Sequence, residues 1–193
     1  MEEIRSFIAI ELPAEVKQKM GELEVRIRKQ REFNCKWVDP ESIHLTLKFL
    51  GNVSSGTLSQ LTDVMTAAAA GTAPLRLEVA GTGVFPNPQR VRVVWVGVKG
   101  DLEVLTQLQQ RLDKGLVGLG FPPEDRPFSP HLTIARVRDE VGPPERQALG
   151  KLIAATGFAG GSFTVEGYSL MRSVLTRQGP IYSRLGHVAF EKV

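Results

Sequence analysis

The stretch His44-Leu45-Thr46-Leu47 indicates the architecture of this chain, because the same pattern returns as His131-Leu132-Thr133-Ile134. Each copy alternates polar and apolar side chains with a period of two, which is typical of a β-strand that buries one face. Histidine and threonine then stand side by side on one face, and the two aliphatic residues are buried behind them. The chain has only three histidines, so two of them in near-identical surroundings indicate a shared role rather than two unrelated buried histidines.

The segments around the two motifs repeat at nearly the same offset. The two histidines are 87 positions apart, and each motif follows a strand-like run and then a helical pattern with one apolar face. A weaker helical pattern and a further strand come after each motif. The matched segments are 7–10 and 93–98, about 14–33 and 101–119, about 55–70 and 143–155, and 75–81 and 163–167. Asp101 is placed to cap the second of the two longer helices.

This pattern predicts an α+β fold built from a duplicated strand–helix–strand–helix–strand unit. We expect one bilobal domain over residues 1–193, with internal repeats at about 5–90 and 91–174. A closing hairpin of strands at about 168–174 and 181–190 then leads to the C-terminus. Duplication produces a pseudo-two-fold axis, which would bring the two histidines to face each other across one cleft. Two imidazoles and two hydroxyls could then bracket a small anion.

The composition is that of an ordinary globular protein, with 42% hydrophobic and 23% charged residues. No segment approaches the ~20 apolar residues that span a membrane and no signal peptide is visible, so we expect a cytoplasmic protein with no membrane partner. We also expect a monomer. A single cysteine, Cys35, excludes an internal disulfide. The histidines and Cys35 lack metal-ligand spacing, so no metal or other cofactor is expected. The net charge of +3, with dispersed arginines, favours a locally positive cleft over a broad nucleic-acid surface.

These residues resemble the signature of the 2H phosphoesterase superfamily. The likeness is carried by the stretches 44–51 and 130–136, and it extends to segments 5–10, 37–41, 83–88, 95–98 and 179–182. Within the superfamily the chain is similar to RNA 2′,3′-cyclic phosphodiesterases of the LigT type, historically called 2′-5′ RNA ligases. The resemblance implies two antiparallel sheets that line a central cleft, with helices on the outside. It also implies metal-independent hydrolysis of a 2′,3′-cyclic phosphate at an RNA 3′ end to a 2′-phosphomonoester.

Two histidines suit this reaction, because an imidazole pKa of about 6.5 lets one ring start neutral as a base and the other start charged as an acid. The resemblance suggests His44 as the proton donor to the ribose 3′-oxygen and His131 as the proton acceptor from water. The residues alone leave this order open, since the repeat makes the two histidines nearly equivalent. Thr46 and Thr133 would each donate a hydrogen bond to a non-bridging phosphate oxygen, although threonine is also a common strand residue.

The two motifs differ five residues after the histidine, where Phe49 stands in one copy and Arg136 in the other. Strict alternation puts both on the face opposite the histidines, so a bulge or a strand end is needed to bring them into the site. Arg136 could then pair with phosphate and Phe49 could stack on a base. The alternatives are a core aromatic for Phe49 and a surface salt-bridge residue for Arg136. Lys48 is expected to be a solvated lysine at a strand edge.

The remaining residues of chemical interest have structural interpretations. His187 is expected to be structural, Cys35 to be a thiol without a partner, and Trp37 and Trp95 to pack the two lobes. Three other functions remain open. One is 2′-5′ RNA ligation, the reverse reaction at the same site, and another is hydrolysis of a cyclic phosphate on a small nucleotide. The third is a module that binds RNA termini without chemistry, against which the four intact histidine and threonine positions argue.

Overall fold

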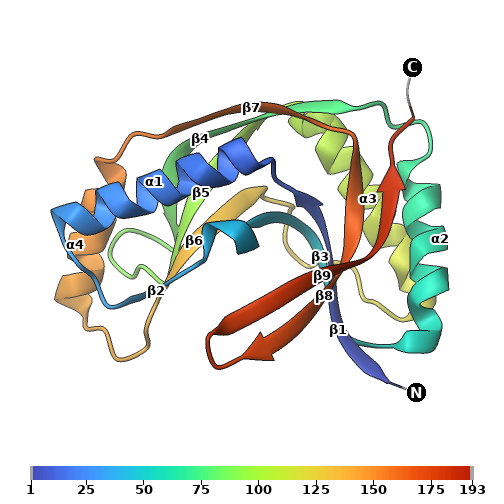
Figure 1. The fold of residues 1–193 in the computed structure, drawn as a ribbon, viewed down its shortest axis with the longest axis horizontal. Helices are drawn as coiled ribbons and strands as arrows, with labels where there is room; N and C mark the ends of the chain where they lie inside the picture. Colours follow the sequence, from blue (N-terminus) through green and yellow to red (C-terminus); the bar gives the residue numbers. More distant parts are fainter. Residues whose placement is uncertain (1, 192–193) are drawn as a thin grey trace.

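Two antiparallel sheets carry the two copies of the motif, one copy in each sheet (Figure 1). The structure, a computed structural model, describes residues 2–191. The strands are β1 (Glu3–Glu11), β2 (Cys35–Trp37), β3 (His44–Ser54), β4 (Leu75–Phe85), β5 (Val93–Gly100), β6 (His131–Val137), β7 (Ala159–Val165), β8 (Gly167–Thr176) and β9 (Gly179–Ala189). The first sheet has the order β3-β1-β8-β9 and the second the order β2-β6-β5-β4-β7. The predicted fold class is confirmed.

Four α-helices cover the outer faces of these sheets. They are α1 (Ala14–Gln30), α2 (Leu58–Ala69), α3 (Leu102–Leu116) and α4 (Pro143–Ala154), and short 3₁₀ turns lie at η1 (Pro40–Ser42), η2 (Ser55–Thr57) and η3 (Val117–Leu119). Helices α2 and α3 lie beside the first sheet, and α1 and α4 lie beside the second (Figure 1). In the described part of the chain, no helix is long and apolar enough to cross a membrane.

The strand register is the same in the two halves of the molecule. Glu11 of β1 pairs with His44 of β3, and Gly97 of β5 pairs with His131 of β6. The contacts with the third strand of each sheet also match, because Ile8 pairs with Leu170 in the first sheet and Val84 pairs with Val94 in the second. Each residue of these pairs lies 86 or 87 positions along the chain from its counterpart in the other sheet, and Val84 is the counterpart of Leu170. This is the symmetry that a duplicated unit requires, while the repeat boundaries at about 5–90 and 91–174 stay a prediction.

The predicted apolar faces form the core. Helix α1 buries Val16, Met20, Leu23 and Ile27, and helix α3 buries Leu105, Leu108, Leu112 and Leu116. The aliphatic residues of the two motifs, Leu45, Leu47, Leu132 and Ile134, are all within the same core cluster. The histidines and threonines therefore stand on the opposite faces of their sheets, as the period of two predicts.

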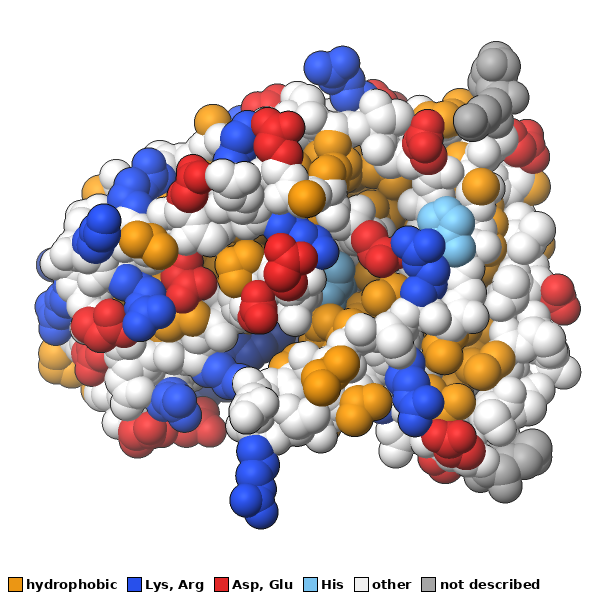
Figure 2. Space-filling model, viewed as in Figure 1, with side chains coloured by type: hydrophobic (Ala, Val, Ile, Leu, Met, Phe, Trp, Pro, Cys, Tyr) orange, Lys and Arg blue, Asp and Glu red, His pale blue; other side chains and the backbone are white. Residues whose placement is uncertain are grey.

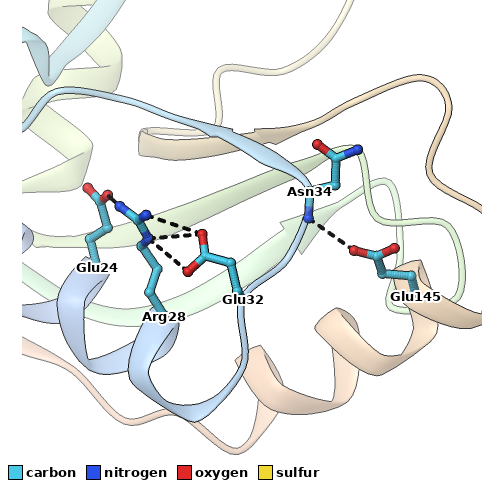
Figure 3. A network of polar contacts seen from close by, with 5 residues as sticks. All are labelled: Glu24, Arg28, Glu32, Asn34 and Glu145. Atoms are coloured by element: carbon cyan, nitrogen blue, oxygen red, sulfur yellow. Dashed lines mark hydrogen bonds and ion pairs between the residues drawn. The ribbon is translucent and has the colours of Figure 1, made fainter.

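The first helix ends earlier than residue 33, the end that its sequence pattern predicts. Helix α1 ends at Gln30, and Arg31 already has an extended backbone. Phe33 instead enters the core from an extended segment. The backbone N–H of Asn34 donates to Glu145 of α4 at 3.0 Å, which fixes this segment against the opposite helix (Figure 3).

Two further expectations need correction. Asp101 stands at the N-cap position of α3 but makes no side-chain cap, because its carboxylate accepts a hydrogen bond from the Arg76 N–H at 2.7 Å. The segment 163–167 is not one strand, since β7 ends at Val165 and β8 begins at Gly167. The break is needed because the chain passes here from the second sheet to the first.

Candidate active site

The two motif strands, β3 and β6, contact each other where the two sheets meet. Their first seven residues have the same burial pattern, in which the histidine and threonine are half-buried between fully buried neighbours. Figure 2 shows a hollow on one face of the molecule, with a histidine at its bottom and basic side chains in its walls. The two motifs therefore lie on strands that contact each other at the junction of the sheets.

Each motif histidine is held through its Nδ1 atom by the backbone two residues earlier. His44 Nδ1 lies 2.9 Å from the carbonyl oxygen of Ser42, and His131 Nδ1 lies 2.8 Å from that of Ser129. A carbonyl only accepts, so both Nδ1 atoms carry a proton. In the neutral rings Nε2 is then the free acceptor, and in the charged rings it is a donor. Both imidazoles are thus prepared to exchange a proton through Nε2.

Aromatic rings enclose His44 within the first sheet. The Phe7 ring stacks on the imidazole at a centroid distance of 4.5 Å, and the Tyr182 ring meets it edge-on at 5.1 Å. Burial among these rings lowers the pKa of His44, and the charge of Lys17 lowers it further. The hydrogen bond to Ser42 and the charge of Glu11 raise the pKa but do not outweigh this decrease. The neutral ring of His44 is therefore favoured in the free protein.

His131 has a different aromatic neighbour in the second sheet. The Phe85 ring meets its imidazole edge-on at 5.0 Å. Trp95 packs against Phe85 with a centroid distance of 5.3 Å, and it lies across Gly83, where a Cβ atom would be 2.1 Å from the indole. Only glycine leaves room for the indole there. Trp37 instead packs against the main core.

A β-bulge at the same place in both motif strands brings Phe49 and Arg136 to the site face. Pairing skips Leu47 in β3 and Ile134 in β6, and this extra residue reverses the alternation that follows it. Phe49 is 64% exposed and its ring lies 6.2 Å from that of Phe7. The interpretation of Phe49 as a core aromatic is therefore wrong.

Arg136 is exposed on the corresponding part of β6. No carboxylate of residues 2–191 lies within ion-pair distance of it, which contradicts the alternative of a surface salt bridge. Burial raises the pKa of Tyr182, and the charges of Arg136 and Arg5 offset part of this increase. The charge of Arg136 in the second sheet therefore acts on a ring that contacts His44 in the first.

The same bulge turns Lys48 into the interior, so the expectation of a solvated lysine is wrong. Its side chain is 4% exposed, and Nζ lies 2.6 Å from Asp113 Oδ1 and 3.1 Å from Glu124 Oε1. It also donates to the carbonyl oxygen of Pro122 at 2.7 Å. Burial alone would lower the pKa of Lys48, but its bonds to Asp113 and Glu124 raise it overall. Lys48 therefore ties β3 to α3 and to the loop that leads to His131.

The other residues of chemical interest lie outside the reacting centre. Burial raises the pKa of the half-buried Cys35 thiol to about 11, so the neutral thiol is favoured. His187 is exposed, and its Nδ1 lies 3.0 Å from Ser169 Oγ. Among the described residues, no group of three or more histidine, cysteine, aspartate or glutamate side chains is arranged to hold a metal ion.

Sequence reasoning did not find three of the rings that line the site, those of Phe7, Phe85 and Tyr182. Tyr182 belongs to the closing hairpin and not to the repeat, so no symmetry argument points to it. Ser42 and Ser129 were also missed, although both stand two positions before a motif histidine. A histidine and a threonine lie half-buried on each motif strand, and Arg136 is exposed on β6; imidazole, hydroxyl and guanidinium groups are a set suited to binding an anion and moving protons around it.

Comparison with known proteins covers nearly the whole chain. Residues 15–176 match the family model described as the 2′-5′ RNA ligase superfamily. The chain is 39% identical over 181 residues to an RNA 2′,3′-cyclic phosphodiesterase of Methanothermobacter thermautotrophicus, covering 93% of this chain and 95% of the relative. It is 34% identical over 188 residues to an RNA 2′,3′-cyclic phosphodiesterase of Thermotoga maritima, covering 97% and 96%.

Solved structures of similar proteins share the fold. One is a protein of Thermus thermophilus, with a TM-score of 0.79 and 31% identity over 98% of this chain and 99% of the other. A second is Escherichia coli LigT in complex with 3′-AMP, with a TM-score of 0.77 and 28% identity over 99% of this chain and all of the other. The likeness extends through both sheets in each case.

Proposed function

The chain belongs to the 2′-5′ RNA ligase superfamily, and we propose that it hydrolyses the 2′,3′-cyclic phosphate at an RNA 3′ end to a 2′-phosphomonoester without a metal. It is a phosphodiesterase, as are the curated relatives that it matches along their length. The observation that carries the proposal is the matched pair of histidines, each donating through Nδ1 to a backbone carbonyl and each without a partner at Nε2 among residues 2–191.

The proposed reaction moves one proton at each histidine. His131 Nε2 takes a proton from water, and the water oxygen attacks phosphorus. The bond between phosphorus and the ribose 3′-oxygen breaks, and His44 Nε2 gives its proton to that oxygen. The phosphate then remains on the 2′-oxygen, and the two histidines exchange their protons with solvent before the next turnover. Each proton transfer contributes roughly 10²–10⁴ in rate.

Binding of the anionic substrate favours the protonated ring of His44, which is the form that acts as the acid. Burial among Phe7 and Tyr182 favours the neutral ring in the free enzyme. A phosphate that binds next to the ring raises the pKa again, because an opposite charge favours the imidazolium. His44 thus takes up its proton together with the substrate.

The remaining site residues hold the phosphate and the base. Thr46 and Thr133 donate hydrogen bonds to the non-bridging oxygens, and Arg136 pairs with the charge that grows on them. Phe49, exposed beside Phe7, stacks on the terminal base. We further propose that the enzyme acts as a monomer, since one chain carries both histidines. We also propose that it is cytoplasmic.

Incubation with an oligonucleotide that ends in a 2′,3′-cyclic phosphate tests this function. Hydrolysis is expected to leave the phosphate on the 2′-oxygen, because His44 protonates the 3′-oxygen. A 3′-phosphate as the product would contradict the role of His44 as the proton donor to the 3′-oxygen. Binding without turnover would instead favour an RNA-terminus-binding module, and joining of a 5′-hydroxyl oligonucleotide would favour ligation.

A further inference from the structure

A polar cluster lies next to His44 on the same face of the first sheet. Glu11 is the strand partner of His44, and Ala9, two residues earlier on the same face, pairs with Ser169. Ser169 pairs in turn with His187 of β9. Because paired strand residues point to the same side of a sheet, these side chains continue the surface that carries the motif. Figure 2 shows a histidine with acidic and basic neighbours on the same face as the hollow, to its right.

Three hydrogen bonds in this cluster converge on one oxygen, Glu11 Oε2. Ser169 Oγ donates to Glu11 Oε2 at 2.7 Å, and Arg184 donates to the same oxygen through Nε at 3.0 Å and Nη2 at 2.6 Å. Since the only hydroxyl proton of Ser169 is used, His187 Nδ1 must donate to Ser169 Oγ, at 3.0 Å. Within residues 2–191, Glu11 Oε1 and Arg184 Nη1 are left without a partner.

The cluster forms one wall of a hollow of about 240 Å³. The opposite wall is the corner between β7 and β8, with Thr164, Glu166 and Gly167. This volume is below the roughly 300–1,000 Å³ of pockets that enclose drug-sized ligands, so a group of the size of one sugar fits. Burial raises the pKa of Glu11, but the bonds from Ser169 and Arg184 outweigh this and lower it.

The charges of the hollow select against a second phosphate. Glu11 and Glu166 line it together with a single arginine, Arg184, and the near side of that arginine is already paired with Glu11. The Glu11 Oε1 acceptor and the Arg184 Nη1 donor are together complementary to a hydroxyl group, which both donates and accepts. A neutral sugar hydroxyl is the group that uses both at once.

We propose that this hollow is the subsite for the nucleotide that precedes the cyclic-phosphate end, with Glu11 Oε1 accepting a hydrogen bond from its ribose 2′-hydroxyl and Arg184 Nη1 donating to the same oxygen. The proposal rests on the proposed function, because it places the cyclic phosphate at His44. The 2′-hydroxyl is the group that distinguishes RNA from DNA. The enzyme therefore reads the sugar one position upstream of the bond that it breaks.

Three substrates test the subsite. They are a nucleoside 2′,3′-cyclic phosphate, a dinucleotide that ends in a cyclic phosphate, and the same dinucleotide with a 2′-deoxyribose at its first position. The wild type is expected to have a kcat/KM about 10-fold higher for the all-ribose dinucleotide than for the deoxy form, the size of one net hydrogen bond. Glu11→Gln and Arg184→Gln should each bring this ratio close to one.

The ratio is measured within each variant, so any loss shared by both dinucleotides cancels. Arg172→Gln is the matched control, because Arg172 lies on the same hairpin and pairs with Glu2 instead; it should keep the wild-type ratio. Equal turnover of the two dinucleotides by the wild type, with the cyclic mononucleotide hydrolysed, overturns the subsite and leaves the proposed function standing. No turnover of any of the three overturns both.

Discussion

Replacing the buried Lys48 by methionine should strongly destabilise the protein. Methionine fills most of the space of the lysine stem, so the loss comes from the charge and its bonds. The substitution removes the Lys48 donor from Asp113 Oδ1, whose side chain is 14% exposed, and from the carbonyl of Pro122, so that Asp113 keeps only the Glu124 N–H on its other oxygen. Removing one partner of a buried ion pair costs about 3–5 kcal/mol. We expect a decrease of this size in the free energy of unfolding.

Urea denaturation followed by circular dichroism measures this change by linear extrapolation. The matched control is Arg28→Met on α1, where an exposed arginine pairs with Glu24 and Glu32 (Figure 3). Surface pairs of this kind contribute little, so the control should unfold close to the wild type. A change below about 1 kcal/mol in Lys48→Met would contradict a buried ion pair at Lys48, because it would mean that the lysine is solvated after all.

The remaining predictions concern the site. His44→Ala and His131→Ala should each lower kcat by at least about 10², and the double variant should lose much less than the product of the two losses; near-normal activity of a folded single variant would exclude that histidine from catalysis. Arg136→Ala should lower the activity on all cyclic phosphates alike. Phe49→Ala should raise KM only for substrates with a base, by a factor that corresponds to the roughly 1–3 kcal/mol of one stacked base. Equal losses on a baseless ribose cyclic phosphate would argue against stacking. Because the folded pKa of His44 is lowered, the unfolded chain binds the proton more tightly, and stability should fall as the pH drops below about 6.5. Unfolding curves of the wild type and His44→Gln across pH 5–8 check this, and the same slope in both would contradict it.

Much of the fold could be predicted because the motif alternates with a period of two and occurs twice. The burial of Leu45 and Leu132 behind the histidines follows from that period alone. The bulge does not follow from it, since Leu47 and Lys48 read equally well as alternating residues. The bulge is what decides that Phe49 is exposed and Lys48 buried. The partners of Lys48 are equally hidden in the sequence, because Asp113 lies 65 positions away.

The placement of the motif residues on their strands could be predicted as far as the symmetry reaches. His44, Thr46, His131 and Thr133 occupy equivalent places in the two halves. Tyr182 enters from the closing hairpin, which has no counterpart in the repeat, so only the folded chain brings it to His44. The polar cluster around Glu11 is hidden for the same reason, since Arg184 is 173 positions away along the chain.

A ³¹P NMR time course of an RNA oligonucleotide ending in a 2′,3′-cyclic phosphate, recorded in excess EDTA, is the sharpest test of catalysis by two histidines without a metal. With two histidines as acid and base, the cyclic phosphate signal should be replaced by a single 2′-phosphomonoester signal at the rate seen without EDTA. The His44→Ala and His131→Ala variants should leave the cyclic signal in place over the same time. Loss of turnover in EDTA, with recovery on addition of Mg²⁺ or Zn²⁺, would contradict the two-histidine mechanism.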